Sequence, residues 1–586
     1  MSDSHRLRRF RAFAVGEGRG GRTIVPNRRG KVVGLLLGLL LLVGLVGCGA
    51  SSTPTPDRGG ATVAVPTVVP SPTPLPLPPD ASVVARIRAR GKLVVGVRYD
   101  QPLYGFVTPQ GDLAGFDVDL ARELARRWLG DPEAVRFVQV TSATWRGRLT
   151  SGEVHLVSAA LPHTREAEAE VAFSQTYDWD GPALLVREDA PIQGPADLVG
   201  RSAAVVSGSE AEAALLEVVG RQGITVTLHS ADDYLVGGQA LLAGQVDAVA
   251  GPRLKLMVVA YRLGGLRVTA PFAQTRPLAL GLPPDDGSFR DLVNFTLQEM
   301  AADGTWATLY RQWFHTEPPA LARWPGSPPF TFATAPATRL APRNGLEAIQ
   351  GRGVLRVGVR MGLPPFAFDD GAGNPAGYEV DLARALAARW LGDPLAVQFV
   401  TVTQETALAA LAGGQVDLVV ALPHTLEAEA QADFGPTHYR DGIGLLIGPN
   451  IGAVEPTDLQ GAVVAVAPGA QNALKVWATG HGVTLTPRPV DGPAAALELL
   501  QTGEVAAYAD ERVTLLRLVL GYQAGTLWPD RLTERPLAIA VPQGDEGLRV
   551  EVALALQEMA VNGSYGELYA RWFGTDPPPA IEIWPP

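Results

Sequence analysis

The sequence is poor in the residues on which many kinds of active site depend. It has a single cysteine, Cys48, in 586 residues, so a disulfide bridge within the chain is impossible. Its eight histidines are scattered, without the spacing of a metal site. It contains neither the G-x-S-x-G pattern of serine hydrolases nor the H-E-x-x-H pattern of zinc proteases. No pair of carboxylates can be placed at acid/base distance. These absences argue against an enzyme, and no metal or cofactor is expected.

Basic charge is scarce outside the N-terminal segment. The chain has a formal net charge of −11, and residues 1–31 hold nine Lys and Arg against only Asp3 and Glu17. The part that follows residue 47 therefore carries −11 − 7 = −18. Nucleic acids and anionic lipids bind to basic patches, so neither is an expected partner. The charge does not predict the sign of a small ligand.

The N-terminal segment is typical of an export signal. After the basic residues comes an apolar run, 32–47, with the sequence VVGLLLGLLLLVGLVG. At about 1.5 Å per residue this run spans roughly 24 Å, which is short for a membrane helix and suits a signal-peptide core. The run ends in LVGC, which resembles the lipobox of bacterial lipoproteins. The resemblance implies removal of residues 1–47, acylation of Cys48 and a protein anchored outside the cytoplasmic membrane; an uncleaved N-terminal anchor is the alternative.

The rest of the chain contains one pattern twice. Residues 48–80 are rich in Pro, Ser and Thr and are expected to form an extended tether. After the tether, five sequence blocks recur in the same order with a shift of about 262 residues. The blocks are GKLVVGVR (91–98) and GVLRVGVR (353–360), GFDVDLAR (115–122) and GYEVDLAR (377–384), LPHT (161–164 and 422–425), LQEMA (297–301 and 556–560), and PPALARWP (318–325) and PPAIEIWP (578–585). We expect two related domains, copy one (82–321) and copy two (345–586), with a Pro-rich linker at 322–344.

Each copy has the alternating pattern of an α/β domain. Residues 93–97 (LVVGV) form an apolar, β-branched run that is typical of a buried parallel strand. From residue 116 the apolar residues recur at helical spacing until GDP at 130–132 ends the helix. Further strands are predicted at 135–140 and 154–160.

These blocks, taken together and in this order, resemble the bacterial extracellular solute-binding proteins of family 3, the polar amino-acid class with the type II periplasmic binding fold. The resemblance covers 82–318 and 345–578. It implies two tandem clamshells, each of two α/β lobes, with a small polar solute (an amino acid or related carboxylate) bound between the lobes. Lobe one of copy one would be 82–185 with about 275–316, and lobe two about 188–272. In copy two the lobes would be 345–446 with 533–575, and 448–530. An ABC permease encoded elsewhere would receive the solute.

The family's pattern also places candidate ligand residues after the first strand of each copy. Where the family usually has Asp, this chain has Arg98 and Arg360, which favour a carboxylate or phosphate unless each is merely paired with a nearby carboxylate. Aromatic rings that could cover a ligand follow; the alternative for them is core packing. They are Tyr104, Phe106, Phe366 and Phe368. Asp117 and Glu379, in the first turn of the predicted helix, complete this set.

The LPHT blocks depart from the family's pattern. The family's carboxylate-clamping Arg is replaced by Ala167 and by Ala428, which puts binding of an α-amino acid in doubt. The candidates that replace it are the neighbouring polar residues of the two blocks. They are His163, Thr164, Arg165, His424 and Thr425. A histidine at such a helix start can also be only a cap or a packed edge.

Lobe two is expected to contribute a helix N-terminus and an acidic residue. Copy one keeps the hydroxyls, Ser207 and Ser209, but has Pro252 at the acidic position. Copy two lacks the hydroxyls and has Asp510 and Glu511. The sequence thus predicts two diverged clamshells, with copy one the better candidate for binding. The rival functions are a sensing lipoprotein that partners a separate membrane sensor, and a lyase or dehydratase on the same fold.

Overall fold

The computed structural model describes residues 77–273, 275–574 and 581–585. The predictions for the signal segment, for Cys48 and for nearly all of the tether lie outside these residues. Among the helices that the structure describes, none combines the length and the apolar character that crossing a membrane requires.

Lobe one of copy one is built on a sheet of order β5-β1-β6-β14-β7, with β8 beside β14. β1 pairs in parallel with β5 and β6, and β14 is antiparallel to β6. The strands are β1 (Leu93–Val97), β5 (Val135–Gln139), β6 (Leu156–Pro162), β7 (Ala172–Phe173), β8 (Asp178–Asp180) and β14 (Arg276–Leu282). The helices are α1 (Val83–Arg90), α2 (Phe116–Leu129), α3 (Trp145–Thr150), α4 (Arg165–Glu168), α8 (Gly287–Asp303) and α9 (Thr305–Phe314). A small sheet of β2 (Asp100–Gln101), β3 (Gly105–Val107) and β4 (Leu113–Ala114) follows β1.

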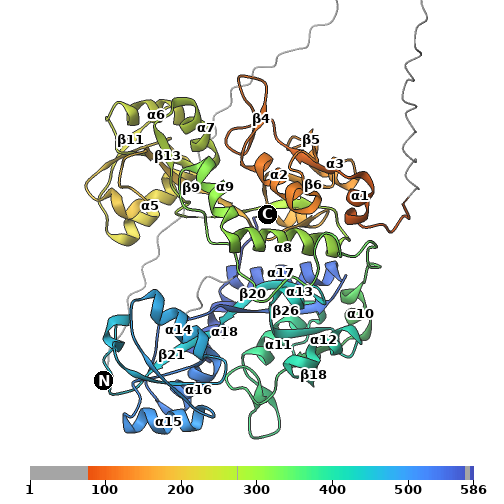
Figure 1. The fold of residues 1–586 in the computed structure, drawn as a ribbon, viewed down its shortest axis with the longest axis vertical. Coiled ribbons are helices and arrows are strands. Elements are labelled where there is room, and N and C mark those ends of the chain that lie inside the picture. The colour runs from red at the N-terminus through yellow and green to blue at the C-terminus, as the bar shows by residue number, and fades with distance from the viewer. Residues whose placement is uncertain (1–76, 274, 575–580, 586) are drawn as a thin grey trace, which may run out of the picture. The chain divides into compact units, whose positions relative to one another are not determined.

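Lobe two of copy one has a sheet of order β11-β10-β12-β9-β13. Its strands are β9 (Pro182–Arg187), β10 (Ser202–Val205), β11 (Thr227–Ser230), β12 (Ala248–Pro252) and β13 (Leu266–Val268). Its helices are the 3₁₀ turn η1 (Pro195–Leu198), α5 (Glu210–Gln222), α6 (Tyr234–Leu242) and α7 (Arg253–Leu263). Figure 1 shows these helices gathered around the strands of the lobe, which leaves the sheet in the centre.

Copy two repeats this plan. Its lobe-one sheet has the order β18-β15-β19-β26-β20, and its lobe-two sheet the order β23-β22-β24-β21-β25. The lobe-one elements are α10 (Gly345–Arg352), β15 (Leu355–Val359), β16 (Phe368–Asp369), β17 (Pro375–Ala376), α11 (Tyr378–Leu391), β18 (Val397–Thr401), α12 (Gln404–Ala412), β19 (Leu418–Pro423), α13 (Leu426–Glu429), β20 (Ala432–Asp441), β26 (Arg535–Pro542), α17 (Glu546–Val561) and α18 (Ser564–Phe573). The lobe-two elements are β21 (Ile443–Ile447), η2 (Pro456–Leu459), β22 (Val463–Val466), α14 (Gln471–Gly480), β23 (Thr486–Pro489), α15 (Pro493–Thr502), β24 (Ala507–Glu511), α16 (Arg512–Tyr522) and β25 (Thr526–Leu527). The prediction of two α/β clamshells is confirmed.

The chain changes lobe earlier than the sequence predicts. β9 pairs with β12 and β13, and β21 pairs with β24 and β25, so both strands belong to lobe two. The expected boundaries at 185 and 446 are therefore wrong. The change occurs at Gly181 (φ 149°) and Gly442 (φ 143°), and a Cβ at Gly442 would lie 1.9 Å from the backbone oxygen of Thr533. The strand before each glycine ends in an aspartate, Asp180 or Asp441, and the strand after it is largely apolar.

The repeated GFD and GYE blocks start the helices α2 and α11. Gly115 has φ 134°, and a Cβ there would lie 2.1 Å from the backbone oxygen of Tyr104, so only glycine fits. The next carboxylate, Asp117, is fully buried and accepts hydrogen bonds from the Ser158 hydroxyl (3.0 Å), the Tyr177 hydroxyl (2.8 Å) and the Ala160 N–H (2.8 Å). The start of α2 is thereby joined to β6.

The linker packs against copy one. The ring of Phe332 stacks on Trp128, with centroids 5.8 Å apart, and Phe330 packs on Phe295. The Ser82 hydroxyl donates to the Pro336 carbonyl at 2.9 Å. These contacts extend the core of lobe one into the Pro-rich segment.

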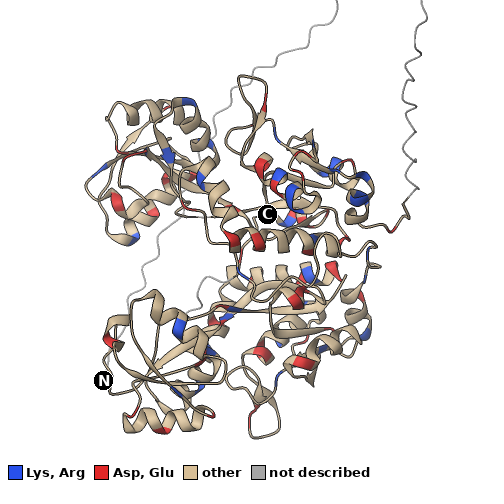
Figure 2. Cartoon of the chain, in the orientation of Figure 1, with Lys and Arg blue, Asp and Glu red and all other residues tan. Residues whose placement is uncertain are grey.

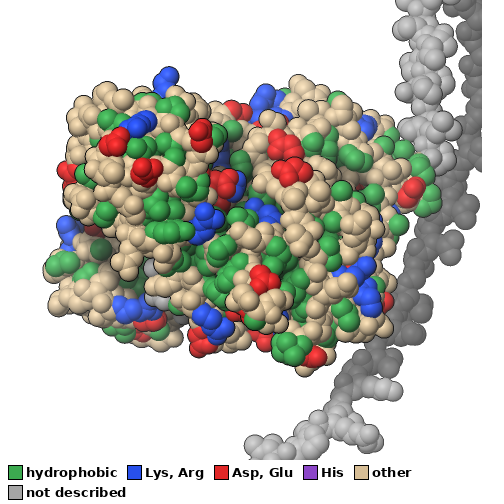
Figure 3. Space-filling view, turned by 90° about the horizontal axis from the view of Figure 1, so that it is seen from below, with side chains coloured by type: hydrophobic (Ala, Val, Ile, Leu, Met, Phe, Trp, Pro, Cys, Tyr) green, Lys and Arg blue, Asp and Glu red, His purple; other side chains and the backbone are tan. Residues whose placement is uncertain are grey.

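Buried charges join the two copies. Arg290 of α8 donates to Asp433 at 2.6 Å and also pairs with Glu546. Arg549, at the equivalent place in α17, pairs with Glu168 of copy one and with Glu546. Burial opposes ionisation of Glu546, but Arg549 and Arg290 outweigh it and lower the pKa of this carboxyl to about 2. Elsewhere, charges of both signs are interspersed along the two copies (Figure 2) and over the face in Figure 3.

We predict that Arg549→Ala lowers the free energy of unfolding by about 3–5 kcal/mol, because it removes the arginine that pairs with the buried Glu168 and leaves Glu546 with Arg290 alone. Denaturant titration followed by tryptophan fluorescence measures the loss. Arg311→Ala is the control, because it removes only the exposed ion pair with Glu317 and should leave the unfolding midpoint unchanged. Equal effects of the two substitutions would contradict the role of the buried charges.

A second prediction concerns Asp117 and its counterpart Glu379. Burial raises the pKa of each carboxyl to about 7, above the 3.8 and 4.5 of the unfolded chain. The folded state therefore retains these protons as pH rises, and the stability they contribute declines between about pH 4 and pH 7. The slope is at most about 1.4 kcal/mol per pH unit for each carboxyl.

Glu379→Gln should flatten this decline, because an amide does not titrate. Urea unfolding midpoints at pH 4.5, 6 and 7.5 for the parent and the variant measure the difference. An unchanged dependence on pH in Glu379→Gln would contradict the prediction.

Candidate functional site

A pocket of about 300 Å³ lies on lobe one of copy one, where β1 and β6 end. The carboxyl ends of parallel strands meet at one edge of a sheet, and ligands of open α/β sheets bind outside that edge. The pocket brings together two of the predicted residues, Arg98 and Thr164. Its other lining residues come from the start of α3, from the loop before it, and from β6 and α4. They are Val140, Thr141, Ser142, Trp145, Arg146, Ala159, Ala160, Leu161, Pro162, Glu166 and Ala167.

Two arginines supply positive charge to this pocket. Arg98 holds Asp100 with both Nε (2.8 Å) and Nη2 (2.9 Å), and its Nη1 donates to the Ser142 hydroxyl at 3.1 Å. Arg146 donates to Glu166 at 3.0 Å. The carboxylate partners are far more exposed than the arginines: 63% for Asp100 and 69% for Glu166, against 25% and 33%. An incoming anion could therefore displace them at small cost, because exposed ion pairs contribute little.

In copy two the equivalent Arg360 has a different environment. It is half-buried, and its Nε has no hydrogen-bond partner among the described residues. Glu379 lies near enough for Arg360 to lower its pKa, although burial raises that pKa more. Glu379 itself is 1% exposed and, like Asp117, is enclosed in the core. Neither of these two carboxylates offers a surface to a ligand in this structure.

The predicted aromatic wall is core instead. Tyr104 and Phe366 have no exposed surface, and Phe366 packs on Tyr439 and Phe573. The other two predicted rings, Phe106 and Phe368, lie nearer the surface than Tyr104 and Phe366. Phe106 is 5% exposed and packs against Tyr261 and Trp313, and the half-buried Phe368 packs against Trp572. Core packing, the alternative that the sequence left open, is what the structure shows for these side chains.

The hydroxyl of Tyr104 belongs to a buried ionic cluster that the sequence did not reveal. Arg253, at the start of α7, is 1% exposed and donates to Asp178 of β8 at 2.9 Å and to Tyr104 at 2.8 Å. Its Nη2 donates to the Tyr310 hydroxyl at 2.6 Å, and Tyr310 donates to Asp178 at 3.0 Å. The cluster joins a helix of lobe two to the strand that leaves lobe one. Arg253 and Tyr310 recur in copy two as Arg512 and Tyr569, but a burial of this degree has no signal in sequence.

The histidines of the two LPHT blocks contact tryptophans of the opposite copy. His163 is stacked between Phe173 and Trp584, with centroid distances of 4.3 Å and 4.0 Å, and its Nε2 is 2.7 Å from Glu168. His424 is stacked in the same way between Phe434 (4.3 Å) and Trp324 (4.2 Å). The structure thus turns both rings toward a second copy, and neither lines the pocket.

The two threonines of the LPHT blocks, and Arg165 that follows the first block, make hydrogen bonds with backbone groups. Thr164 and Thr425 accept hydrogen bonds from the N–H groups of Ala167 and Ala428 and cap α4 and α13. Arg165 donates from Nε to the backbone oxygen of Trp584 at 3.0 Å.

In lobe two of copy one, the predicted hydroxyls lie at the start of α5. Ser209 caps this helix by accepting from the Glu212 N–H, and the exposed Ser207 shares a hydrogen bond of 2.8 Å with Ser230. The structure does not bring these serines into the pocket that contains Arg98.

The predicted acidic residues of copy two are already paired. Asp510 accepts from the Tyr508 hydroxyl at 2.5 Å. Glu511 is bound to Arg535 at 2.5 Å, and Arg535 also holds the buried Asp441 at 3.0 Å. Asp441 ends β20 and Arg535 begins β26, so these contacts lie at the hinge of copy two, where the chain passes from lobe one to lobe two and back.

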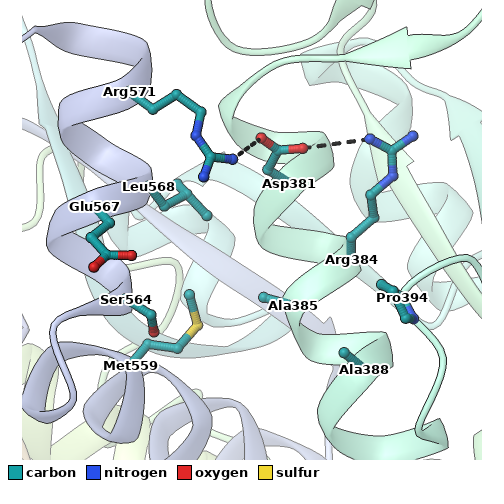
Figure 4. A pocket seen from close by; sticks show the side chains of 10 residues that line it. All are labelled: Asp381, Arg384, Ala385, Ala388, Pro394, Met559, Ser564, Glu567, Leu568 and Arg571. Carbon is teal, nitrogen blue, oxygen red and sulfur yellow. Dashed lines mark hydrogen bonds and ion pairs between the residues drawn. The ribbon is translucent and has the colours of Figure 1, made fainter. Parts of the chain in front are cut away.

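A second pocket of about 300 Å³ lies in copy two between α11 and α18 (Figure 4). Asp381 lies at its rim, 3.5 Å from Arg384 and 3.3 Å from Arg571. None of the residues that line it was predicted to contact a ligand. Among the described residues, no group of three or more His, Cys, Asp or Glu side chains could hold a metal ion.

Comparisons with known proteins identify the architecture. Residues 93–316 and 355–575 each match the Bacterial extracellular solute-binding proteins, family 3. The glutamine-binding protein of Geobacillus stearothermophilus is 30% identical over 248 residues, which are 42% of this chain and 89% of that protein. The ABC transporter glutamine-binding protein of Bacillus subtilis is 27% identical over 237 residues, 40% of this chain and 85% of that protein.

Solved structures match over the length of a single copy. A mutant of the arginine-binding protein of T. maritima is 27% identical and matches with a TM-score of 0.27, covering 40% of this chain and 100% of that one. An ancestral cyclohexadienyl dehydratase is 26% identical with a TM-score of 0.35, covering 40% and 98%. Because the family matches twice and over most of the sequence, the chain belongs to the bacterial extracellular solute-binding proteins of family 3, and it contains two tandem copies of their fold.

Proposed function

We propose that this protein is a lipid-anchored, extracytoplasmic binding protein that captures a small polar solute for an ABC importer encoded separately. The solute is an amino acid or a related carboxylate. The single observation that carries the proposal is the pocket of copy one, in which Arg98 and Arg146 face a polar opening at the carboxyl edge of the sheet. The names of its relatives, which include glutamine-binding and cystine-binding proteins, support the solute class.

The chemistry of the pocket favours a ligand with a carboxylate. Arg98 already holds a carboxylate, that of Asp100, with two parallel N–H donors, and a ligand carboxylate could take this position. The Thr141 and Ser142 side chains, which line the same wall, offer hydroxyl groups beside it. Arg98, which follows the neighbouring strand β1, would compensate for the clamp that is missing at Ala167.

Lobe two would complete the site when the clamshell closes. The N-terminus of α5, with Ser207 and Ser209, offers N–H and hydroxyl donors to an anion. Contacts that a ligand makes with both lobes stabilise the closed state over the open one, because only the closed state provides them. An importer would recognise this closed state. Uptake in a deletion strain that retains the permease distinguishes this function from that of a sensing lipoprotein.

We predict that Arg98→Ala weakens ligand binding by copy one about tenfold or more, since a charge-assisted hydrogen bond contributes about 1.5–3 kcal/mol. Arg360→Ala should weaken binding by copy two in the same way. Both should leave the unliganded protein stable. Calorimetry and thermal shift of the full chain with L-glutamine, L-glutamate, L-arginine, L-cystine and succinate measure these effects.

Arg148→Ala is the matched control, because Arg148 lies on α3 like Arg146 but does not line the pocket. Binding as tight in Arg98→Ala as in the parent would exclude the proposed carboxylate contact. A flat thermal shift of the parent across the panel would count against this solute class.

We also predict that Cys48→Ala moves the protein from the membrane fraction to the soluble extracytoplasmic fraction, because the acyl chains on Cys48 would be its anchor. Fractionation and incorporation of labelled palmitate measure the change. Palmitate incorporation that persists in Cys48→Ala would contradict the proposed site of acylation.

A further inference from the structure

After the last helix of each copy, a short segment contacts the other copy; the first of these segments is the start of the linker. We define exit segment one as residues 322–327 and exit segment two as residues 581–585. In exit segment two, Trp584 stacks on His163 of copy one, and the Pro585 backbone oxygen accepts from the Arg165 N–H at 2.9 Å. The Glu582 carboxylate of the same segment accepts from the Thr176 hydroxyl of copy one at 2.6 Å.

Exit segment one makes the reciprocal contacts. Trp324 stacks on His424 of copy two, and the Pro325 backbone oxygen accepts from the Leu426 N–H at 3.0 Å. The N–H of Ser327 donates to the Glu427 carboxylate of copy two at 2.6 Å. The same three kinds of contact, a ring stack, a backbone hydrogen bond to a proline carbonyl and a bond between a carboxylate and a polar donor, therefore occur in both directions.

Each tryptophan is also held by a glutamine of its own copy. The backbone N–H of Trp584 donates to the Gln557 side-chain oxygen of α17 at 2.8 Å, and the backbone N–H of Trp324 donates to the Gln298 side-chain oxygen of α8 at 3.2 Å. Both glutamines come from the repeated LQEMA block. The exit segments are thus arms that are bound by equivalent helices, α8 and α17, and contact the opposite copy.

The surface that receives exit segment two is the reverse side of the proposed binding pocket. Thr164, Glu166 and Ala167 line the pocket, whereas His163 and Arg165, which alternate with them along the chain, contact the arm. The helix here, α4, has only four residues. A helix this short is not stable on its own, so its conformation depends on what packs against it.

We propose that each exit segment is a positioning element for the pocket of the opposite copy. The LPHT block is the receptor for a Trp-Pro arm of a second copy, and its histidine orders the helix that lines the pocket. The effect on ligand affinity rests on the binding function proposed above, whereas the reciprocal docking of the arms does not.

Hydrogen–deuterium exchange of the full chain tests the docking without any ligand. Trp584→Ala should raise amide exchange in residues 163–171 of copy one about tenfold or more and leave residues 424–432 of copy two unchanged, because local opening becomes easier where the arm is lost. Trp324→Ala should give the opposite pattern. Trp584→Phe should restore part of the protection, since a phenyl ring still stacks on the imidazole.

Two results would overturn the docking. One is no change of exchange in either region, and the other is faster exchange only in the copy that itself carries the substitution. General unfolding of Trp584→Ala would raise exchange throughout both copies. In that case Trp584→Phe decides: protection of residues 163–171 in this variant supports the ring stack, and its absence contradicts the stack.

Calorimetry with L-glutamine as the probe tests the second step. Trp584→Ala should weaken binding by copy one roughly 2- to 30-fold, the range expected for coupling through packed side chains. Faster exchange with unchanged affinity would show that the arm docks but does not position the pocket. If the parent does not bind L-glutamine or any other member of the panel, the proposed function fails while the exchange result still decides the docking.

Discussion

An arginine that is 1% exposed must be surrounded by acceptors, because an isolated buried cation costs several kcal/mol. Arg253 finds its acceptors in Asp178, Tyr104 and Tyr310, which belong to lobe one or to the strand that leaves it. Arg253 itself begins a helix of lobe two. The geometry of the hinge in copy one, and with it the way in which lobe two can approach the pocket, depends on satisfying this one charge.

Copy two lacks the buried cluster that surrounds Arg253 in copy one. Tyr439 and Phe366 replace Asp178 and Tyr104 in the repeat, so no carboxylate awaits the equivalent arginine. Arg512 instead donates to the backbone oxygen of Trp528 at 2.8 Å and remains half-buried. The hinge of copy two is held by Arg535, which bridges Asp441 and Glu511. The two clamshells therefore share a fold but differ in the forces at the point where each would bend.

Much of the fold could be predicted from the sequence, because its signals are local. The buried strand β1, the helix α2 with its glycine start, and the repeat itself depend on residues close together in the chain. The position of Arg98 at the edge of the sheet follows from the same pattern. The orientation of Tyr104 could not be predicted, since it depends on Arg253, 149 positions away. The role of His163 depends on its stacking with Trp584, a residue still more remote in sequence. Arg165, two residues after His163, is 419 positions from Trp584. Contacts of this kind have no periodicity that a single sequence displays.

The exchange of exit segments has a further consequence because both arms belong to one polypeptide. Two separate chains would have to meet before their arms could dock, and the extent of docking would fall with dilution; within one chain the partner is always present at a high effective concentration. Two identical chains would also be obliged to use the same residues on both sides. The tandem chain is free of that symmetry, so Arg165 can hold the arm of copy two while Leu426, at the equivalent place, offers only its backbone N–H. Fusion preserves the pairing of the copies while it permits their pockets to diverge.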